Sequence, residues 1–234
     1  MRVYEIPEGS KNYKGRAIQN LINIEQDDKV KSFICNQDLK DEDYINSHYV
    51  IMATKMGQVK KTSLEQYSRP RSNGINAITV KDKDELLEAK LTNGSSQIML
   101  AVKSGKAIRF EESKTRPMGR NASGVRGIRL KDKSDEVIGM VSVKDMDENI
   151  LVVSENGYGK RSSLENYRLT NRGGKGVKTI SITEKTGKLV TIKSVSDNDD
   201  LMIINKSGIA IRMQVEDLRV MGRATQGVKA ISIK

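Results

Sequence analysis

Four stretches of the chain share one pattern of apolar and polar positions. In each stretch a short apolar run ends at a turn glycine, and a second run follows with a Lys or Arg four residues after that glycine. Apolar, β-rich runs bounded by Ser, Asn and Gly predict β-strands joined by hairpin turns. The copies span residues 49–61, 98–109, 150–161 and 201–212, with turn glycines Gly57, Gly105, Gly157 and Gly208 spaced by 48, 52 and 51 residues.

A second glycine follows each copy, 17 residues after the turn glycine in the first copy and 19 residues after it in the other three. It stands directly before a β-branched residue. These second glycines are Gly74, Gly124, Gly176 and Gly227. Residues 136–143 and 188–195 predict a further strand in each repeat. A degenerate fifth copy opens the chain, where residues 2–6 match the second strand and Gly15 matches the second glycine.

About four strands in a repeat of about 50 residues are typical of a propeller blade. We therefore predict an all-β, propeller-like fold, in which stacked neighbours bury the faces that one blade alone leaves open. The predicted blades of this single domain span residues 1–47 (partial), 48–96, 97–147, 148–198 and 199–234. No segment shows a sustained helical period. The acidic stretch 38–43 is therefore expected to be a solvated loop, and Cys35 a small core residue.

Composition excludes several classes of function. One cysteine and one histidine rule out an internal disulfide, a cysteine-based metal cluster and a two-histidine metal site. The phosphate-loop pattern GxxxxGK[ST] does not occur in the chain. No apolar run approaches the roughly 18 residues that a membrane span needs. The cysteine usage fits a reducing, cytoplasmic compartment.

The net charge of the chain indicates a class of binding partner. The 41 Lys and Arg exceed the 30 Asp and Glu by 11, which favours a polyanionic partner. The excess is confined to five segments that end at or just beyond the second glycines, where 50 residues carry 15 basic and no acidic side chains. Equivalent loops of a repeat array lie along one edge, so we predict a belt of positive charge that binds phosphates rather than base edges. The segments are residues 11–16, 67–74, 115–126, 167–178 and 218–229.

Other classes explain the charge pattern less well. A surface that only keeps the protein soluble would mix charges of both signs. A propeller that scaffolds acidic protein partners would share the positive belt, and it stays open as an alternative. A polysaccharide-binding propeller would need aromatic platforms, and the chain has no Trp.

The basic residues at repeated positions are the candidates for DNA contact. They stand four residues after a turn glycine, within the basic segments, or two residues after a second glycine. Because they recur with the blades, we expect them to bind the phosphates of one duplex without reading its sequence. The set is Lys61, Arg69, Arg71, Arg109, Arg116, Arg120, Arg126, Arg161, Arg168, Arg172, Lys175, Lys178, Arg212, Arg219, Arg223 and Lys229.

Several strings, in order along the whole chain, resemble the C-terminal domain of bacterial DNA gyrase A subunits. They are VYEIPEGSKNYKGRAIQNLINIE near the start, Lys60-Lys61-Thr62, RPMGR…GVRGIR at 116–129, NGYGKR at 156–161 and MGR…QGV at 221–228. The C-terminal domain of the topoisomerase IV A protein is similar and is the alternative within the family. The resemblance implies a six-bladed β-pinwheel, in which neighbouring blades exchange strands and duplex DNA wraps around a basic rim.

The resemblance also implies a box of the form Q-[RK]-R-G-G-K-G in the first blade of the family. Its last five positions are matched by a box-like loop in the third complete repeat, whereas Thr170 and Asn171 differ from its opening. The box-like loop consists of Arg172, Gly173, Gly174, Lys175 and Gly176.

By the same resemblance, the chain is expected to be a monomeric fragment of a larger bacterial protein. It would work with the rest of the gyrase A protein and with the gyrase B protein. It would present wrapped DNA to the strand-passing core of DNA gyrase for ATP-dependent negative supercoiling. The chain itself is expected to be no enzyme and to carry no catalytic residue, metal or cofactor.

Overall fold

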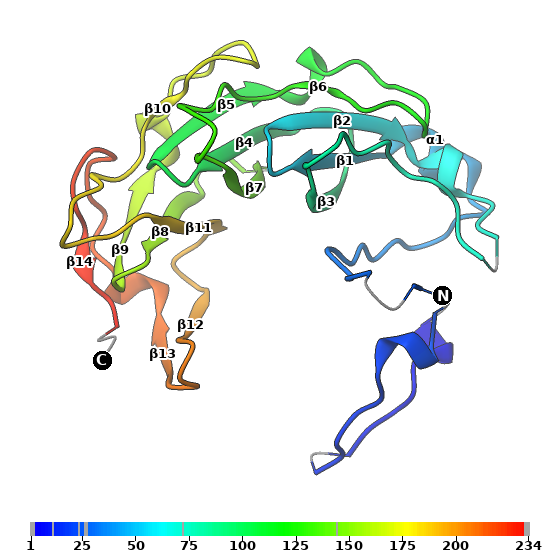
Figure 1. Ribbon diagram of the computed structural model, residues 1–234, viewed down its shortest axis with the longest axis horizontal. Helices are drawn as coiled ribbons and strands as arrows, with labels where there is room; N and C mark the ends of the chain where they lie inside the picture. The colour runs from blue at the N-terminus through cyan, green and yellow to red at the C-terminus, as the bar shows by residue number, and fades with distance from the viewer. Residues whose placement is uncertain are drawn as a thin grey trace.

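Three four-stranded antiparallel sheets and one two-stranded sheet follow one another in the computed structural model (Figure 1). The structure describes residues 3–10, 12–22, 24–25, 28–71, 73–143 and 145–231. We name the sheets blade 1 (β3-β1-β2-β6), blade 2 (β7-β4-β5-β10), blade 3 (β11-β8-β9-β14) and blade 4 (β12-β13). They form an open arc, with β3, β7 and β11 at its inner edge and β6, β10 and β14 at its outer edge (Figure 1). The predicted all-β fold with four-stranded blades is confirmed.

Each complete blade is a hairpin flanked by an inner strand and a two-residue outer strand. Blade 1 consists of β1 (Tyr49–Thr54), β2 (Gln58–Ser63), β3 (Leu86–Thr92) and β6 (Val125–Arg126). Blade 2 consists of β4 (Gln97–Val102), β5 (Lys106–Glu111), β7 (Val137–Val143) and β10 (Val177–Lys178). Blade 3 consists of β8 (Asn149–Ser154), β9 (Tyr158–Ser163), β11 (Leu189–Val195) and β14 (Val228–Lys229). Blade 4 pairs β12 (Asp200–Ile204) with β13 (Ala210–Gln214).

Short helices connect these strands. A 3₁₀ helix follows the second strand of each hairpin, at Leu64–Tyr67, Glu112–Lys114, Leu164–Asn166 and Val215–Asp217. Two more 3₁₀ helices, Val3–Glu5 and Ile18–Asn20, and the α-helix α1, Glu42–Ser47, precede blade 1. No helix in the described parts of the chain is long and apolar enough to cross a membrane.

Neighbouring blades exchange strands. The outer strand of each complete blade comes from the next repeat: β6 pairs with β2, β10 pairs with β5, and β14 pairs with β9. Each of these outer strands begins at the β-branched residue that follows a second glycine. The strand exchange that the resemblance implied is thus present in all three complete blades.

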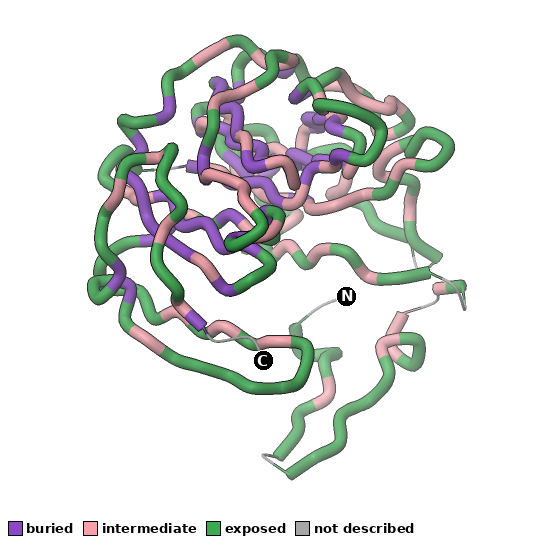
Figure 2. The backbone as a smooth tube through the Cα atoms, turned by 60° about the vertical axis from the view of Figure 1, so that its left-hand side comes forward, coloured by how far each residue is buried: buried purple, intermediate pink, exposed green. Residues whose placement is uncertain are grey.

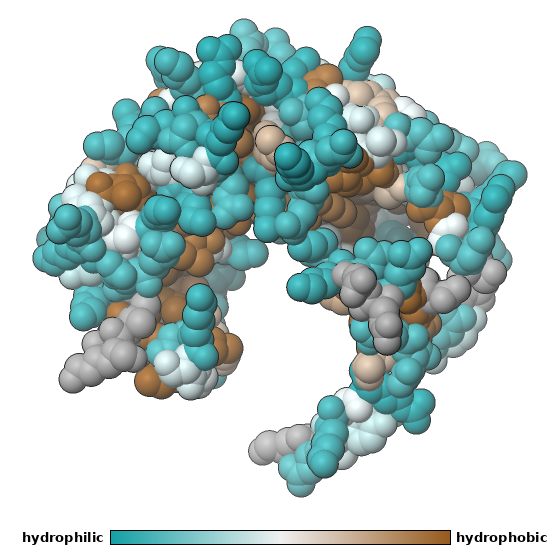
Figure 3. Space-filling model, in the orientation of Figure 1, coloured by the Kyte–Doolittle hydropathy of each residue, from teal (hydrophilic) through white to brown (hydrophobic). Residues whose placement is uncertain are grey.

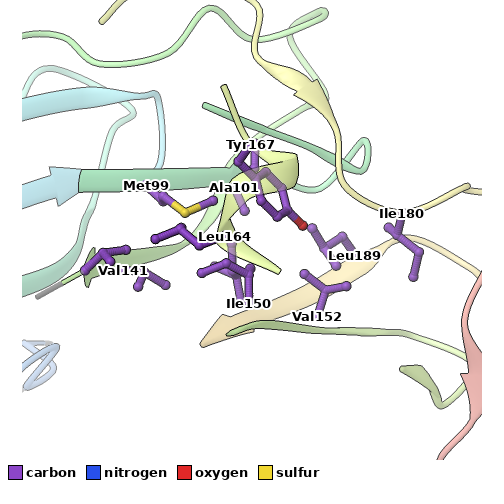
Figure 4. Packing of buried hydrophobic residues seen from close by; sticks show 12 residues of the cluster. Met99, Ala101, Val141, Ile150, Val152, Leu164, Tyr167, Ile180 and Leu189 are labelled. Atoms are coloured by element: carbon purple, nitrogen blue, oxygen red, sulfur yellow. The ribbon is translucent and has the colours of Figure 1, made fainter. Parts of the chain in front are cut away.

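Blade faces pack directly on one another, so the hairpin strands are buried on both sides. Ile51, Ala53 and Val59 of blade 1 belong to one buried cluster with Ile98 and Leu100 of blade 2. Figure 4 shows the next cluster, where Met99 and Ala101 of blade 2 pack with Ile150 and Val152 of blade 3. In Figure 2 the buried positions accordingly run through the middle of the stacked sheets. Each fully buried aliphatic side chain contributes roughly 1.5–3 kcal/mol.

Blade 4 has a neighbour on one face only. Leu201 and Met213 pack against blade 3, in a cluster with Leu151 and Val153. Met202 on the opposite face is 60% exposed, although the equivalent Leu151 of blade 3 is 1% exposed. The repeat pattern places the same residue types on this face, and the missing neighbour explains their exposure.

Three local expectations are wrong. Residues 2–6 form no strand where they are described: Val3–Glu5 is a 3₁₀ helix, and Arg2 lies outside the described residues. The acidic stretch 38–43 leads into α1, because the Asp41 carboxylate accepts a hydrogen bond from the backbone N–H of Tyr44 and caps the helix. Cys35 is exposed, because its segment lies along the edge strand β3, where Ser32 Oγ donates to the carbonyl of Ala89, and not between two blades.

The second glycines explain how the outer strands reach the preceding blade. Gly176 has a φ of +69°, and a Cβ there would lie 2.5 Å from the carbonyl oxygen of Ala107 in blade 2. At Gly124 and Gly227 a Cβ would lie 2.6 Å from the carbonyl oxygens of Val59 and Gly159. A side chain at these positions would push the outer strand off its partner.

Gly176→Ala is therefore expected to lower the free energy of unfolding by about 3 kcal/mol or more, because it adds a backbone clash to the cost of a positive φ. The matched control is Gly74→Ala, where φ is +77° and nothing lies within 4 Å of the added Cβ. It should cost only about 1 kcal/mol. Chemical denaturation of both variants measures the difference, and equal losses would contradict a role for close packing.

Candidate nucleic-acid interface

Three basic loops run along the outer edge of the arc (Figure 1). They comprise residues 115–126, 167–178 and 218–229. Each begins after the 3₁₀ helix of its own blade and ends in the outer strand of the preceding blade. Strand exchange therefore forces every basic loop to cross from one blade to the next at the outer edge.

Backbone hydrogen bonds join the second and third basic loops to the residues that directly follow the preceding loop. The N–H of Gly173 donates to the carbonyl of Gly127 at 2.6 Å, and the N–H of Arg129 donates to the carbonyl of Gly174 at 2.8 Å. At the next junction the N–H of Ser181 donates to the carbonyl of Thr225 at 3.0 Å. The loops and the residues that follow them thus form one continuous ribbon of main chain across blades 1 to 3.

Half-buried arginines add side-chain bonds to this ribbon. Arg172 donates from Nε to the carbonyl of Lys114 at 2.9 Å and from a terminal nitrogen to that of Arg126 at 3.1 Å. Arg223 donates to the carbonyl of Lys178 at 2.8 Å. Arg120, at the equivalent place in its loop, is half-buried as well. Arg172 and Arg223 thus carry charge to the outer edge and also hold the backbone of the preceding loop.

Ten of the sixteen predicted cations are exposed. Figure 3 shows hydrophilic side chains over most of the outer edge of the arc. Seven of the ten lie in the basic loops and two follow the 3₁₀ helix of blade 1. Arg212 lies on β13 of blade 4, where it pairs with Asp200. The exposed set is Arg69, Arg71, Arg116, Arg126, Arg168, Lys175, Lys178, Arg212, Arg219 and Lys229. Lys11 of the first basic segment lies outside the described residues.

The box-like loop lies in the second basic loop, residues 167–178. Lys175 is exposed at its tip, Gly173 has a φ of +80°, and Gly176 lies against β5. The Lys175 side chain of this loop is therefore open to solvent, while Gly176 packs on blade 2.

The other three predicted cations are buried between blades. We name Lys61, Arg109 and Arg161 the inter-blade cations; each stands four residues after a turn glycine and is at most 6% exposed. Lys61 Nζ lies 2.9 Å from Glu112 Oε1 of blade 2 and 4.0 Å from the centre of the Tyr49 ring. This burial corrects the prediction for all three residues: their side chains are not part of the exposed belt.

Arg109 and Arg161 bind the 3₁₀ helix of the following blade. Arg109 donates to the carbonyls of Leu164 and Tyr167, both at 2.9 Å. Arg161 donates to the carbonyls of Leu218 and Glu216 and pairs with the carboxylate of Asp197. These side chains supply hydrogen-bond donors to buried carbonyls between the blades, and burial lowers the pKa of Arg109.

Replacing Arg109 with Met should lower the free energy of unfolding by about 2–4 kcal/mol, because two buried carbonyls lose a charged donor. Arg212→Met is the matched control, since Arg212 occupies the same repeat position on the exposed face of blade 4. It should change stability by no more than about 0.5 kcal/mol. Urea denaturation of both variants provides the test, and a stable Arg109→Met protein would refute the structural role.

Sequence reasoning missed two further buried cations, Lys60 and Lys160. They precede Lys61 and Arg161 directly, and neither is exposed at all. The signal was the pair of adjacent cations at the same place in two repeats. On a strand, adjacent side chains point to opposite faces. Since both faces of these blades are buried, both members of each pair are buried.

Comparisons with known proteins agree with this architecture. A family model described as "DNA gyrase C-terminal domain, beta-propeller" matches residues 1–37, 48–93, 97–144, 148–196 and 199–234. The DNA gyrase A protein of Staphylococcus epidermidis is 43% identical over 234 residues, which are 100% of this chain and 26% of that protein. The chain thus spans about a quarter of the length of the curated relatives it matches.

Two solved structures share the fold. A structure of the DNA gyrase A C-terminal domain has a TM-score of 0.84 at 24% identity and covers 100% of this chain and 74% of that chain. The C-terminal domain of DNA topoisomerase IV also has a TM-score of 0.84 at 24% identity, covering 93% of this chain and 66% of that chain.

The fold and its basic outer edge define a β-propeller-like domain whose blades exchange strands. Within that class, the family model covers most of the chain, in five segments that follow its repeats. The chain belongs to the DNA gyrase C-terminal domain family.

Proposed function

We propose that this chain binds duplex DNA through its phosphates and bends it along the outer edge of the arc. The main support is the continuous ribbon that the basic loops form with the residues following them, which is hydrogen-bonded from blade to blade by backbone groups and by Arg172 and Arg223. None of the three loops contains an acidic residue. Exposed Arg and Lys side chains next to glycine-rich backbone suit phosphate oxygens and carry no information about base sequence.

The curvature of the ribbon gives a reason for bending. A duplex that touches one basic loop can stay straight, but one that touches all three must follow the arc (Figure 1). Bending 20–30 base pairs by 40–90° costs on the order of 1–6 kcal/mol. Several phosphate contacts on each blade can offset that cost, as happens on the histone octamer, where no contact is base-specific.

The relatives suggest the larger setting. In a bacterial DNA gyrase, a domain that bends DNA would present the duplex to the strand-passing core for ATP-dependent supercoiling. We accordingly propose the rest of the gyrase A protein and the gyrase B protein as the partners of the chain, in the bacterial cytoplasm where the chromosome lies. The chain itself then contributes DNA binding and no catalytic step. A topoisomerase IV setting would use the same surface.

Gel shifts of a duplex of about 100 base pairs across a salt series test DNA binding. We expect the logarithm of the affinity to fall linearly with the logarithm of salt concentration, with a slope of several units. Religation of a nicked circle in the presence of the protein then tests whether the bent duplex also wraps out of one plane, because such a wrap changes the linking number of the religated circle. No binding at 50 mM salt would overturn the proposal and favour an acidic protein as the partner.

Single substitutions in the basic loops test the surface itself. Arg168→Ala should weaken binding to the same extent for unrelated DNA sequences and reduce the salt slope by about 0.9. Lys193→Ala is the control, because Lys193 is an exposed cation on β11, at the opposite edge of blade 3. It should leave affinity and slope unchanged. Equal effects of the two variants would contradict the assignment of the outer edge.

A further inference from the structure

Two buried ammonium groups lie directly beneath basic loops. Lys60 Nζ donates to the carbonyl oxygens of Ala77 and Arg120, both at 2.5 Å. Lys160 Nζ donates to the carbonyl oxygen of Gly222 at 2.6 Å. Arg120 and Gly222 belong to the basic loops that the next repeat supplies to blades 1 and 3. Each lysine thus binds the backbone of a loop far from it in sequence.

The two lysines occupy the same place in their repeats, three residues after the turn glycine. They point to the face opposite the inter-blade cations, since each directly precedes one of them on its strand. In both cases the bonded carbonyl lies at, or one residue before, the half-buried arginine of the loop. The arrangement therefore occurs twice, once in blade 1 and once in blade 3.

Blade 2 shows that an apolar side chain also packs at this place. Ile108 stands three residues after the turn glycine and is 2% exposed. The loop above it, residues 167–178, is held by its own Arg172, which donates to the carbonyls of Lys114 and Arg126. A lysine is therefore not needed to fill the space. Its ammonium group adds a bond to the loop.

We propose that Lys60 and Lys160 are positioning residues, whose buried ammonium groups hold the basic loops 115–126 and 218–229 in the conformation that binds DNA phosphates. This inference rests on the proposed DNA-binding function. On this proposal the two buried side chains do not touch DNA but fix the loops that do.

The charge on these lysines is sensitive to pH. Burial, together with the nearby guanidinium groups of Arg120 and Arg223, lowers the pKa of Lys60 and of Lys160 to about 8. Neither lysine forms an ion pair with an acidic side chain in the described residues. A neutral amine has fewer N–H donors and no charge. The hydrogen bonds from the two lysines to the loop carbonyls therefore weaken as the pH rises through 8.

Other groups near the lysines do not titrate in this range. The Tyr67 hydroxyl donates to the same Ala77 carbonyl as Lys60, and burial raises the pKa of Tyr67. Tyr167 lies beside Thr179 on the Lys160 side, and burial raises its pKa too. Both phenols therefore stay neutral near pH 8. The change in protonation between pH 7 and 9 therefore occurs on the two lysine ammonium groups.

The sign of the effect separates DNA binding from unfolding. A lysine with a pKa of about 8 in the fold and about 10.4 in the unfolded chain makes the fold relatively more stable as the pH rises between these values. DNA affinity should fall over the same range. Weaker binding at alkaline pH would therefore not result from loss of the fold through these groups.

The test compares the wild-type chain with Lys60→Met, Lys160→Met and the double variant, using a duplex of about 100 base pairs at pH 7, 8 and 9. Wild-type affinity should fall by up to about tenfold for each lysine between pH 7 and 9. The double variant should bind more weakly at pH 7 and lose this additional pH dependence. Lys193→Met serves as the control and should follow the wild-type profile.

Hydrogen exchange of the amides in residues 116–126 and 219–229 measures, in the absence of DNA, how firmly the loops are fixed in their conformation. After correction for intrinsic exchange, wild-type protection should fall from pH 7 to 9, and the double variant should be less protected than the wild type at pH 7 and show no such fall. If the double variant kept the affinity, the pH profile and the loop protection of the wild-type chain, the inference would be overturned. If the wild-type chain binds no DNA at pH 7, the proposed function fails, and loop protection then decides the lysine contacts separately.

Discussion

The structure depends on burial of both faces of each blade hairpin. An isolated antiparallel sheet can turn its polar side chains to water on one face. In blades 1 to 3 that option is absent, because a neighbouring blade or loop covers each face. Charged side chains on the second hairpin strand must therefore find partners inside the protein. Lys61 pairs with a carboxylate, Arg109 donates hydrogen bonds to carbonyls, and Lys60 donates to carbonyls on the other face.

Strand exchange links this packing to the outer surface. The residues that complete one blade are the last residues of a basic loop whose first residues belong to the next blade. The loop cannot be displaced without losing an outer strand, and two blades cannot separate without stretching the loop. Gly124, Gly176 and Gly227 permit the required approach of two backbones. Stability of the stack and geometry of the candidate DNA-binding surface are consequently properties of the same residues.

The repeat could be predicted from the sequence because its glycine turns and apolar runs respond to local rules of backbone and burial. The inner strands Val137–Val143 and Leu189–Val195 follow from the same rules and are confirmed. The exposure of cations could not be predicted in this way. The repeated cation after the turn glycine predicts a surface contact only if one face of the strand meets water. Nothing local distinguishes the buried Arg109 from the exposed Arg212; the presence of a following blade does.

The same constraint bears on how the outer edge could bend DNA. Phosphates repeat along a duplex regardless of sequence, so a surface that binds them must hold its cations at set intervals. Flexible side chains alone would adapt to a straight duplex and would not enforce a bend. Here the basic loops and the residues following them are hydrogen-bonded to one another and, through Lys60 and Lys160, to the stacked blades beneath them. A rigid curved ribbon makes further contacts only with a duplex that follows it, so the energy of contact and the energy of bending are coupled through the buried contacts between blades.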